Sequence, residues 1–167
     1  MPARALIELL YGKGAHANPI ACVEDLSAEL AGLRVDNLPH SVWQIVWHMN
    51  FWTDHDLRRI RGENPRYPEH ASEGWPLESA PASEAEWKKG AARFAECIGV
   101  LAAMAEADAN TLNREVPPTH PTHVNRASTV VALLWQISAH NSYHVGQIAL
   151  VRRALGAWPP RGGGDSW

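Results

Sequence analysis

Apolar residues recur at intervals of three and four along four stretches of the chain, which is the spacing of one face of an α-helix. The clearest stretch follows Ser83, where the sequence Ser-x-x-Glu, ending at Glu86, is typical of a capping box at a helix N-terminus. Its apolar positions are Trp87, Ala91, Phe94, Ile98, Leu101 and Ala105. This pattern predicts a long amphipathic helix with one face toward a bundle core.

Two further long helices lie on either side of it in the sequence. One is predicted from Ser41, whose hydroxyl can accept from an unpaired amide of the first turn, to about Arg61. The other is predicted from near Ser128 to Gly156, with two prolines shortly beyond it as stop signals. The apolar positions of this last helix are Leu133, Ile137, Ile148, Val151 and Leu155, and two histidines lie among them.

The N-terminal part predicts the fourth helix. It begins near Ala3, is weakened by Gly12 and Gly14, and is followed by Asn18-Pro19, a pattern typical of a cap that starts a new helical segment. No stretch shows the strict alternation of a half-buried β-strand. The sequence therefore predicts an all-α four-helix bundle with long inter-helix loops, and one domain over residues 1–167.

Composition excludes several classes of protein. Charged residues make up 20% of the chain and apolar residues 46%, which is ordinary for a globular domain. The net charge is −3 and the basic residues are scattered, so we expect no nucleic-acid partner. The longest apolar run, Cys97–Ala105, is far shorter than the roughly 18 residues that span a bilayer, so we expect no membrane partner and a cytoplasmic location. Cys22 and Cys97 are expected to be buried free thiols.

The candidate chemistry is carried by histidines. His140 and His144 stand four residues apart in the apolar stripe of the last helix, so their side chains share one face. Two such imidazoles can bind one metal ion, and His48, at the edge of the apolar face of the Ser41 helix, offers a third ligand. Three histidine ligands leave a coordination position open for water or substrate. The alternative is that these residues are hydrogen-bonded core histidines.

Other metal sites of helical proteins fit less well. A zincin peptidase needs a glutamate directly after the first histidine of the pair, and Asn141 stands there. A di-iron bundle needs carboxylates in its core stripes, and the predicted stripes have none. A haem held by two axial histidines stays open, although the chain has no attachment motif.

Several segments together resemble the DinB/YfiT-like superfamily of metalloenzymes. They are Gly14-Ala15-His16, Pro39-His40-Ser41 with Trp43 and His48, Trp75-Pro76, Trp87, the run from His140 to Ile148, and Leu155-Gly156-Ala157-Trp158. The resemblance implies a four-helix bundle, a homodimer formed through an exposed apolar face, and one divalent metal ion held by His48, His140 and His144. Three imidazoles suit zinc, nickel, copper or iron, and of these we expect zinc or nickel. The resemblance also implies thiol-dependent chemistry of the kind that uses bacillithiol or mycothiol.

Two classes of function follow from this resemblance. The first is a metal-dependent enzyme that acts on a small-molecule thiol or electrophile, such as a low-molecular-weight-thiol S-transferase, or alternatively a metal-dependent hydrolase. The second is a metal-binding or stress-related protein without turnover.

Around the site, Tyr143 and Gln147 are expected either to orient a ligand or to pack against neighbouring helices. The loop around Trp75 is expected either to cover the site or simply to pack. Asp54, His55 and Asp56 follow His48 along its helix, and one of them could face the site as a general base; we expect a solvated helix face instead. His16, His40, His70, His120 and His123 are expected not to be ligands.

Overall fold

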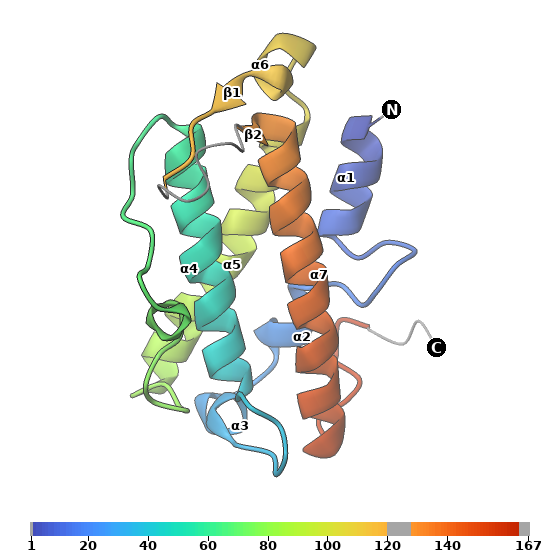
Figure 1. The fold of residues 1–167 in the computed structure, drawn as a ribbon. Helices are drawn as coiled ribbons and strands as arrows, with labels where there is room; N and C mark the ends of the chain where they lie inside the picture. The colour runs from blue at the N-terminus through green and yellow to red at the C-terminus, as the bar shows by residue number, and fades with distance from the viewer. Residues whose placement is uncertain (1, 120–127, 164–167) are drawn as a thin grey trace.

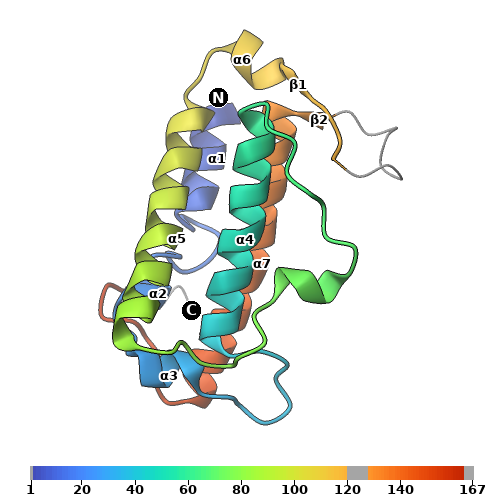
Figure 2. The same cartoon turned by 90° about the vertical axis from the view of Figure 1, so that its left-hand side faces the viewer.

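Four helices pack side by side in the computed structural model, which describes residues 2–119 and 128–163 (Figure 1). They are α1 (Pro2–Leu10), α4 (Val42–Ile60), α5 (Glu84–Ala105) and α7 (Val130–Ala154). α4 contacts both α5 and α7, and α1 contacts the same two helices, so the four form a closed bundle. The second view shows α5 and α4 in front, with α7 behind α4 (Figure 2). The predicted all-α fold is confirmed.

The starts of the long helices follow the capping residues in the sequence. Ser41 accepts from the amide of Gln44, and the Gln44 side chain accepts from the amide of Ser41, which completes a capping box for α4. Ser83 accepts from the amide of Glu86 as predicted, but the Glu86 carboxylate accepts from Ala82 instead of Ser83. The predicted capping box is therefore only half formed.

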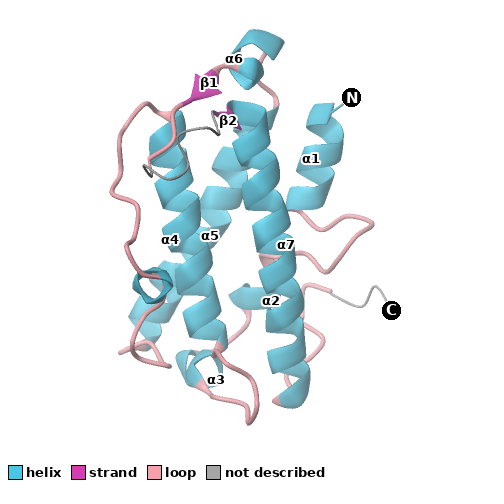
Figure 3. Cartoon of the chain, in the orientation of Figure 1, coloured by secondary structure: helices cyan, strands magenta, loops and turns pink. Residues whose placement is uncertain are grey.

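The connections between the long helices hold short elements that the periodicity did not predict. These are α2 (Ala21–Glu24), α3 (Ala28–Gly32), the 3-10 helix η1 (Ala71–Gly74), α6 (Ala109–Asn113), and the antiparallel strands β1 (Glu115–Val116) and β2 (Ser128–Thr129) (Figure 3). Each is five residues or shorter, so it spans too few turns to show a helical or strand period. Asn18 accepts from the amides of Ile20 and Ala21, in agreement with the predicted cap there.

The core lies between the four helices and contains the predicted apolar positions of α5 and α7. Trp87, Phe94, Leu133 and Ile148 are all buried there. The indole nitrogen of Trp87 donates to the carbonyl of Leu26 at 2.6 Å, so this large side chain buries no unpaired donor.

Cys22 and Cys97 are buried free thiols, as predicted. No helix in the described ranges is long and apolar enough to cross a membrane.

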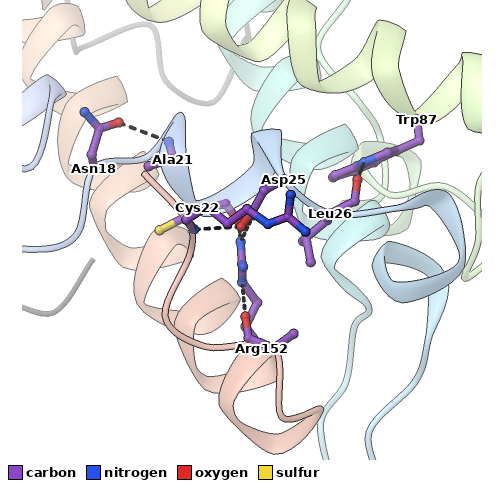
Figure 4. Close-up of polar contacts among 9 residues, drawn as sticks. Asn18, Ala21, Cys22, Asp25, Leu26, Trp87 and Arg152 are labelled. Atoms are coloured by element: carbon purple, nitrogen blue, oxygen red, sulfur yellow. Dashed lines mark hydrogen bonds and ion pairs between the residues drawn. The ribbon is translucent and has the colours of Figure 1, made fainter. Parts of the chain in front are cut away.

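A buried arginine ties α2 to the end of α7. Arg152 is only 2% exposed, and it donates to the carbonyl of Cys22 at 2.7 Å, to the Asp25 carboxylate at 2.8 Å and to the carbonyl of Ala157 at 2.9 Å (Figure 4). Burial of this guanidinium is tolerated because its Nε and Nη1 groups have three acceptors, one of them a carboxylate. These hydrogen bonds fasten α2 and Asp25 to the C-terminal part of α7, a link that no local sequence pattern predicts.

Candidate metal centre

Three histidine side chains meet between α4 and α7. His48 comes from the middle of α4, and His140 and His144 come from successive turns of α7. The Nε2 atom of His140 lies 3.1 Å from the Nε2 atom of His48 and 3.1 Å from that of His144. Two nitrogens bound at 2.0–2.1 Å to a tetrahedral ion would be about 3.3 Å apart. The structure thus brings together the three residues that the sequence singled out: two of the nitrogen pairs are close to the spacing that one ion requires, and all three ligand atoms lie within 4.8 Å of one another.

The outer nitrogens of two of these rings have defined partners. His48 Nδ1 donates to the carbonyl of Gly74 at 2.7 Å, and His144 Nδ1 donates to Oε1 of Gln147 at 2.7 Å. A carbonyl oxygen can only accept, so each contact places the ring proton on Nδ1. The Nε2 atoms of His48 and His144 therefore carry lone pairs directed at the cluster, the arrangement that metal-bound histidines adopt.

Hydrogen bonding among the three rings cannot satisfy these lone pairs. His140 Nε2 can supply one proton, to either His48 or His144, so one of the two short nitrogen–nitrogen contacts always lacks a hydrogen bond. An extra proton is disfavoured, because burial lowers the pKa of His48 and that of His144 from 6.5 to about 4. Burial also lowers the pKa of His140. Three neutral imidazoles with converging lone pairs fit a divalent cation.

The connection between α4 and α5 covers one side of the cluster. The indole of Trp75 stacks on His48, with ring centroids 3.8 Å apart, and also on His40, at 3.7 Å. Both imidazoles cannot share one face of the indole at such distances, so Trp75 lies between them. A Cβ atom at Gly74 would lie 3.1 Å from Trp52 Nε1, which explains a glycine beside this close approach. This long connection therefore both covers His48 and supplies its acceptor.

A cavity of about 270 Å³ lies next to His140. Its lining residues come from α4, α7 and the segment after α4: Trp52, Thr53, Asp56, Tyr67, Gln136, Ile137 and His140. The cavity makes the cluster reachable by a small molecule.

The face of α4 that carries Asp54, His55 and Asp56 differs from the prediction. His55 and Asp56 are buried, at 5% and 4% exposure, so a solvated face is wrong for these two residues. The segment that follows α4 explains the difference, because Tyr67 packs its ring against that of His55. Asp54 is half-buried and pairs with Arg93 of α5 at 3.0 Å.

The remaining residues around the site take other roles. His16 lies against Ala17 and Ser142, and His40 stacks on Trp75, so neither joins the three clustered histidines. His70 is exposed before η1. His120 and His123 lie outside the described residues. Tyr143 is 65% exposed with its ring edge-on to His144, whereas Gln147 orients His144 directly.

The fold and the site define a class: an all-α bundle with three converging histidines from two of its helices. Within that class, the chain belongs to the DinB superfamily, because the family's sequence profile matches residues 15–148. That match covers most of the chain and includes all three histidines of the cluster. No curated protein and no solved structure matches the chain.

Proposed function

We propose that His48, His140 and His144 bind one divalent metal ion, zinc or nickel, and that the protein is a metal-dependent S-transferase for a low-molecular-weight thiol. One observation carries the metal site: three Nε2 atoms converge within 4.8 Å of one another while the outer nitrogens of His48 and His144 are held by acceptors. That donor set suits zinc and nickel alike.

An open coordination position supports an enzyme over a closed structural site. Among the described residues, no fourth histidine, cysteine or carboxylate joins the cluster. His140 borders a cavity through which a small molecule would reach the cluster as a fourth ligand. A divalent ion held there supplies Lewis acidity, which lowers the pKa of a coordinated thiol so that thiolate forms at neutral pH.

The reacting thiol has to come from another molecule. Burial raises the pKa of Cys22 to about 11 and also raises the pKa of Cys97, so both thiols stay protonated at neutral pH. Neither residue belongs to the histidine cluster. The chain's own contribution is to orient the imidazoles through Gly74 and Gln147, to cover His48 with Trp75 and to admit the substrate through the cavity.

Metal analysis of untagged protein tests this proposal. We expect about one ion per chain by plasma mass spectrometry, lost in His144→Ala and retained in the control His70→Ala, which removes an exposed imidazole outside the cluster. The cobalt(II)-loaded protein should then show a thiolate charge-transfer absorption when a thiol is added. No metal in the unaltered protein would overturn the site. Bound metal without any response to thiol would overturn the transferase and favour a hydrolase or a non-catalytic metal protein.

We also propose that the protein is a homodimer that pairs through α7. Trp135, Tyr143 and Leu150 are large, 57–65% exposed, and spaced by eight and seven residues, so they lie on one face of this helix. Sedimentation should give a dimer for the unaltered protein and a monomer for Tyr143→Glu. Leu77→Glu, at an exposed loop position, should leave the mass unchanged. A monomer before any substitution would contradict the proposal.

A further inference from the structure

The cavity beside His140 extends along α4, away from the cluster. His48, Trp52 and Asp56 follow one another at intervals of four, so they lie on one side of that helix. With a rise of 1.5 Å per residue, the Cα atoms of His48 and Asp56 are about 12 Å apart along the axis. A molecule with one end at the histidine cluster therefore has its other end near Asp56.

Two polar atoms at this far end have no hydrogen-bond partner among the described residues. Thr53 is only 1% exposed, yet its Oγ1 forms no hydrogen bond. The Asp56 carboxylate uses one oxygen, Oδ1, which accepts from Arg59 at 2.9 Å and from His55 at 3.4 Å. Its Oδ2 accepts no hydrogen bond from the described residues. A buried hydroxyl without a partner is costly, and both Thr53 and Asp56 are lining residues of the same cavity.

The walls around these two groups are aromatic. The rings of Trp52 and Tyr67 lie 5.5 Å apart and both border the cavity. Aromatic faces attract cations, and Asp56 is the charged side chain among the lining residues. Arg59 binds the opposite carboxylate oxygen and does not line the cavity.

We infer that the Asp56 end of this cavity is a subsite for a protonated amine of the substrate. The ammonium group would donate to Asp56 Oδ2 and to Thr53 Oγ1, beside the rings of Trp52 and Tyr67. A carboxylate in its place would be repelled by Asp56, and a neutral hydroxyl would form hydrogen bonds that are not charge-assisted. The inference rests on the proposed function only for the other end of the substrate, at the histidine cluster.

Simple amphiphiles test the subsite without any thiol. Hexylamine, hexan-1-ol and hexanoate are titrated against the protein as purified, with binding followed by NMR. We expect hexylamine to bind about tenfold tighter than hexan-1-ol, and hexanoate to bind weakest. The preference should disappear in Asp56→Asn and persist in Asp54→Asn, which removes the same charge from the same helix outside the cavity.

A second variant keeps the test decisive if loss of the Asp56–Arg59 pair unfolds the protein. Thr53→Val has nearly the same shape and removes only the unpartnered hydroxyl, so it should reduce the amine preference while the fold persists. Equal or tighter binding of hexan-1-ol or hexanoate to the unaltered protein would overturn the inference. Retention of the amine preference in both Asp56→Asn and Thr53→Val would overturn it as well.

A thiol series separates this inference from the proposed function. On the metal-loaded protein, 6-aminohexane-1-thiol should bind about tenfold tighter than 6-sulfanylhexan-1-ol. If both thiols bind equally, the amine subsite is refuted and the thiol site stands. If neither thiol reaches the metal while hexylamine keeps its preference, the proposed transferase is refuted and the amine subsite stands.

Discussion

Replacement of Gln147 by leucine tests how far the outer hydrogen bonds determine metal binding. The substitution removes the oxygen that accepts from His144 Nδ1 at 2.7 Å and preserves approximate side-chain volume. The Nδ1–H group of His144 then has no acceptor, and no hydrogen bond keeps the proton on Nδ1 rather than on Nε2. Gln147 borders a second cavity, together with His40 and Leu150, and is not among the lining residues of the cavity beside His140. The substitution therefore leaves the proposed substrate pocket unchanged.

The expected loss follows from the cost of that unpaired donor. A buried N–H without a partner costs about 1–3 kcal/mol, and 1.4 kcal/mol corresponds to a factor of ten in affinity. Metal affinity should therefore fall about tenfold to hundredfold, the range typical of outer-shell partners of metal-bound histidines. Gln147→Glu restores an acceptor and should recover the affinity.

Competition with a chromophoric chelator at neutral pH measures this change. Gln136→Leu is the matched control, because Gln136 is exposed on the same helix and is not hydrogen-bonded to any of the three histidines in the described part of the chain. Circular dichroism shows whether each variant keeps its helix content. An affinity within twofold of the unaltered protein for Gln147→Leu, or an equal loss for Gln136→Leu, would refute the reasoning.

Three further outcomes are expected. Arg152→Leu leaves Asp25 without its buried partner and should lower the free energy of unfolding by about 3–5 kcal/mol in urea titrations; Arg153→Leu, at the exposed next position, should cost under about 1 kcal/mol. Burial lowers the pKa of His48 and His144 to about 4, so the folded metal-free chain binds fewer protons than the unfolded chain between pH 6.5 and 4. The free energy of unfolding of the metal-free protein, measured by urea titration, should be highest above pH 6.5 and should fall by about 2 kcal/mol per histidine between pH 7 and 5. The fall should be smaller in His144→Gln, which lacks one of these imidazoles. Removal of metal with a chelator should lower the melting temperature and added zinc should restore it, since a ligand of the native state stabilises that state; an unchanged melting temperature would argue against a bound ion.

The sequence by itself determined the features that depend on local backbone geometry. A helical period of 3.6 residues places His140 and His144 on one face of a helix, whatever surrounds that helix. Ser41 and Ser83 cap their helices because a side-chain oxygen reaches an amide only two or three residues away. The long helices and the histidine pair were therefore predictable from residues close together in the chain.

The tertiary structure decided which side chains are buried and what each one contacts. His48 meets its two partners across 92 and 96 residues of sequence, and its orientation comes from Gly74, in a connection that has no helical period. The same connection covers His55 and Asp56, although they follow a polar pattern that predicts exposure. Burial depends on where an aperiodic segment packs, and that packing is set by contacts between distant residues, which no local pattern records.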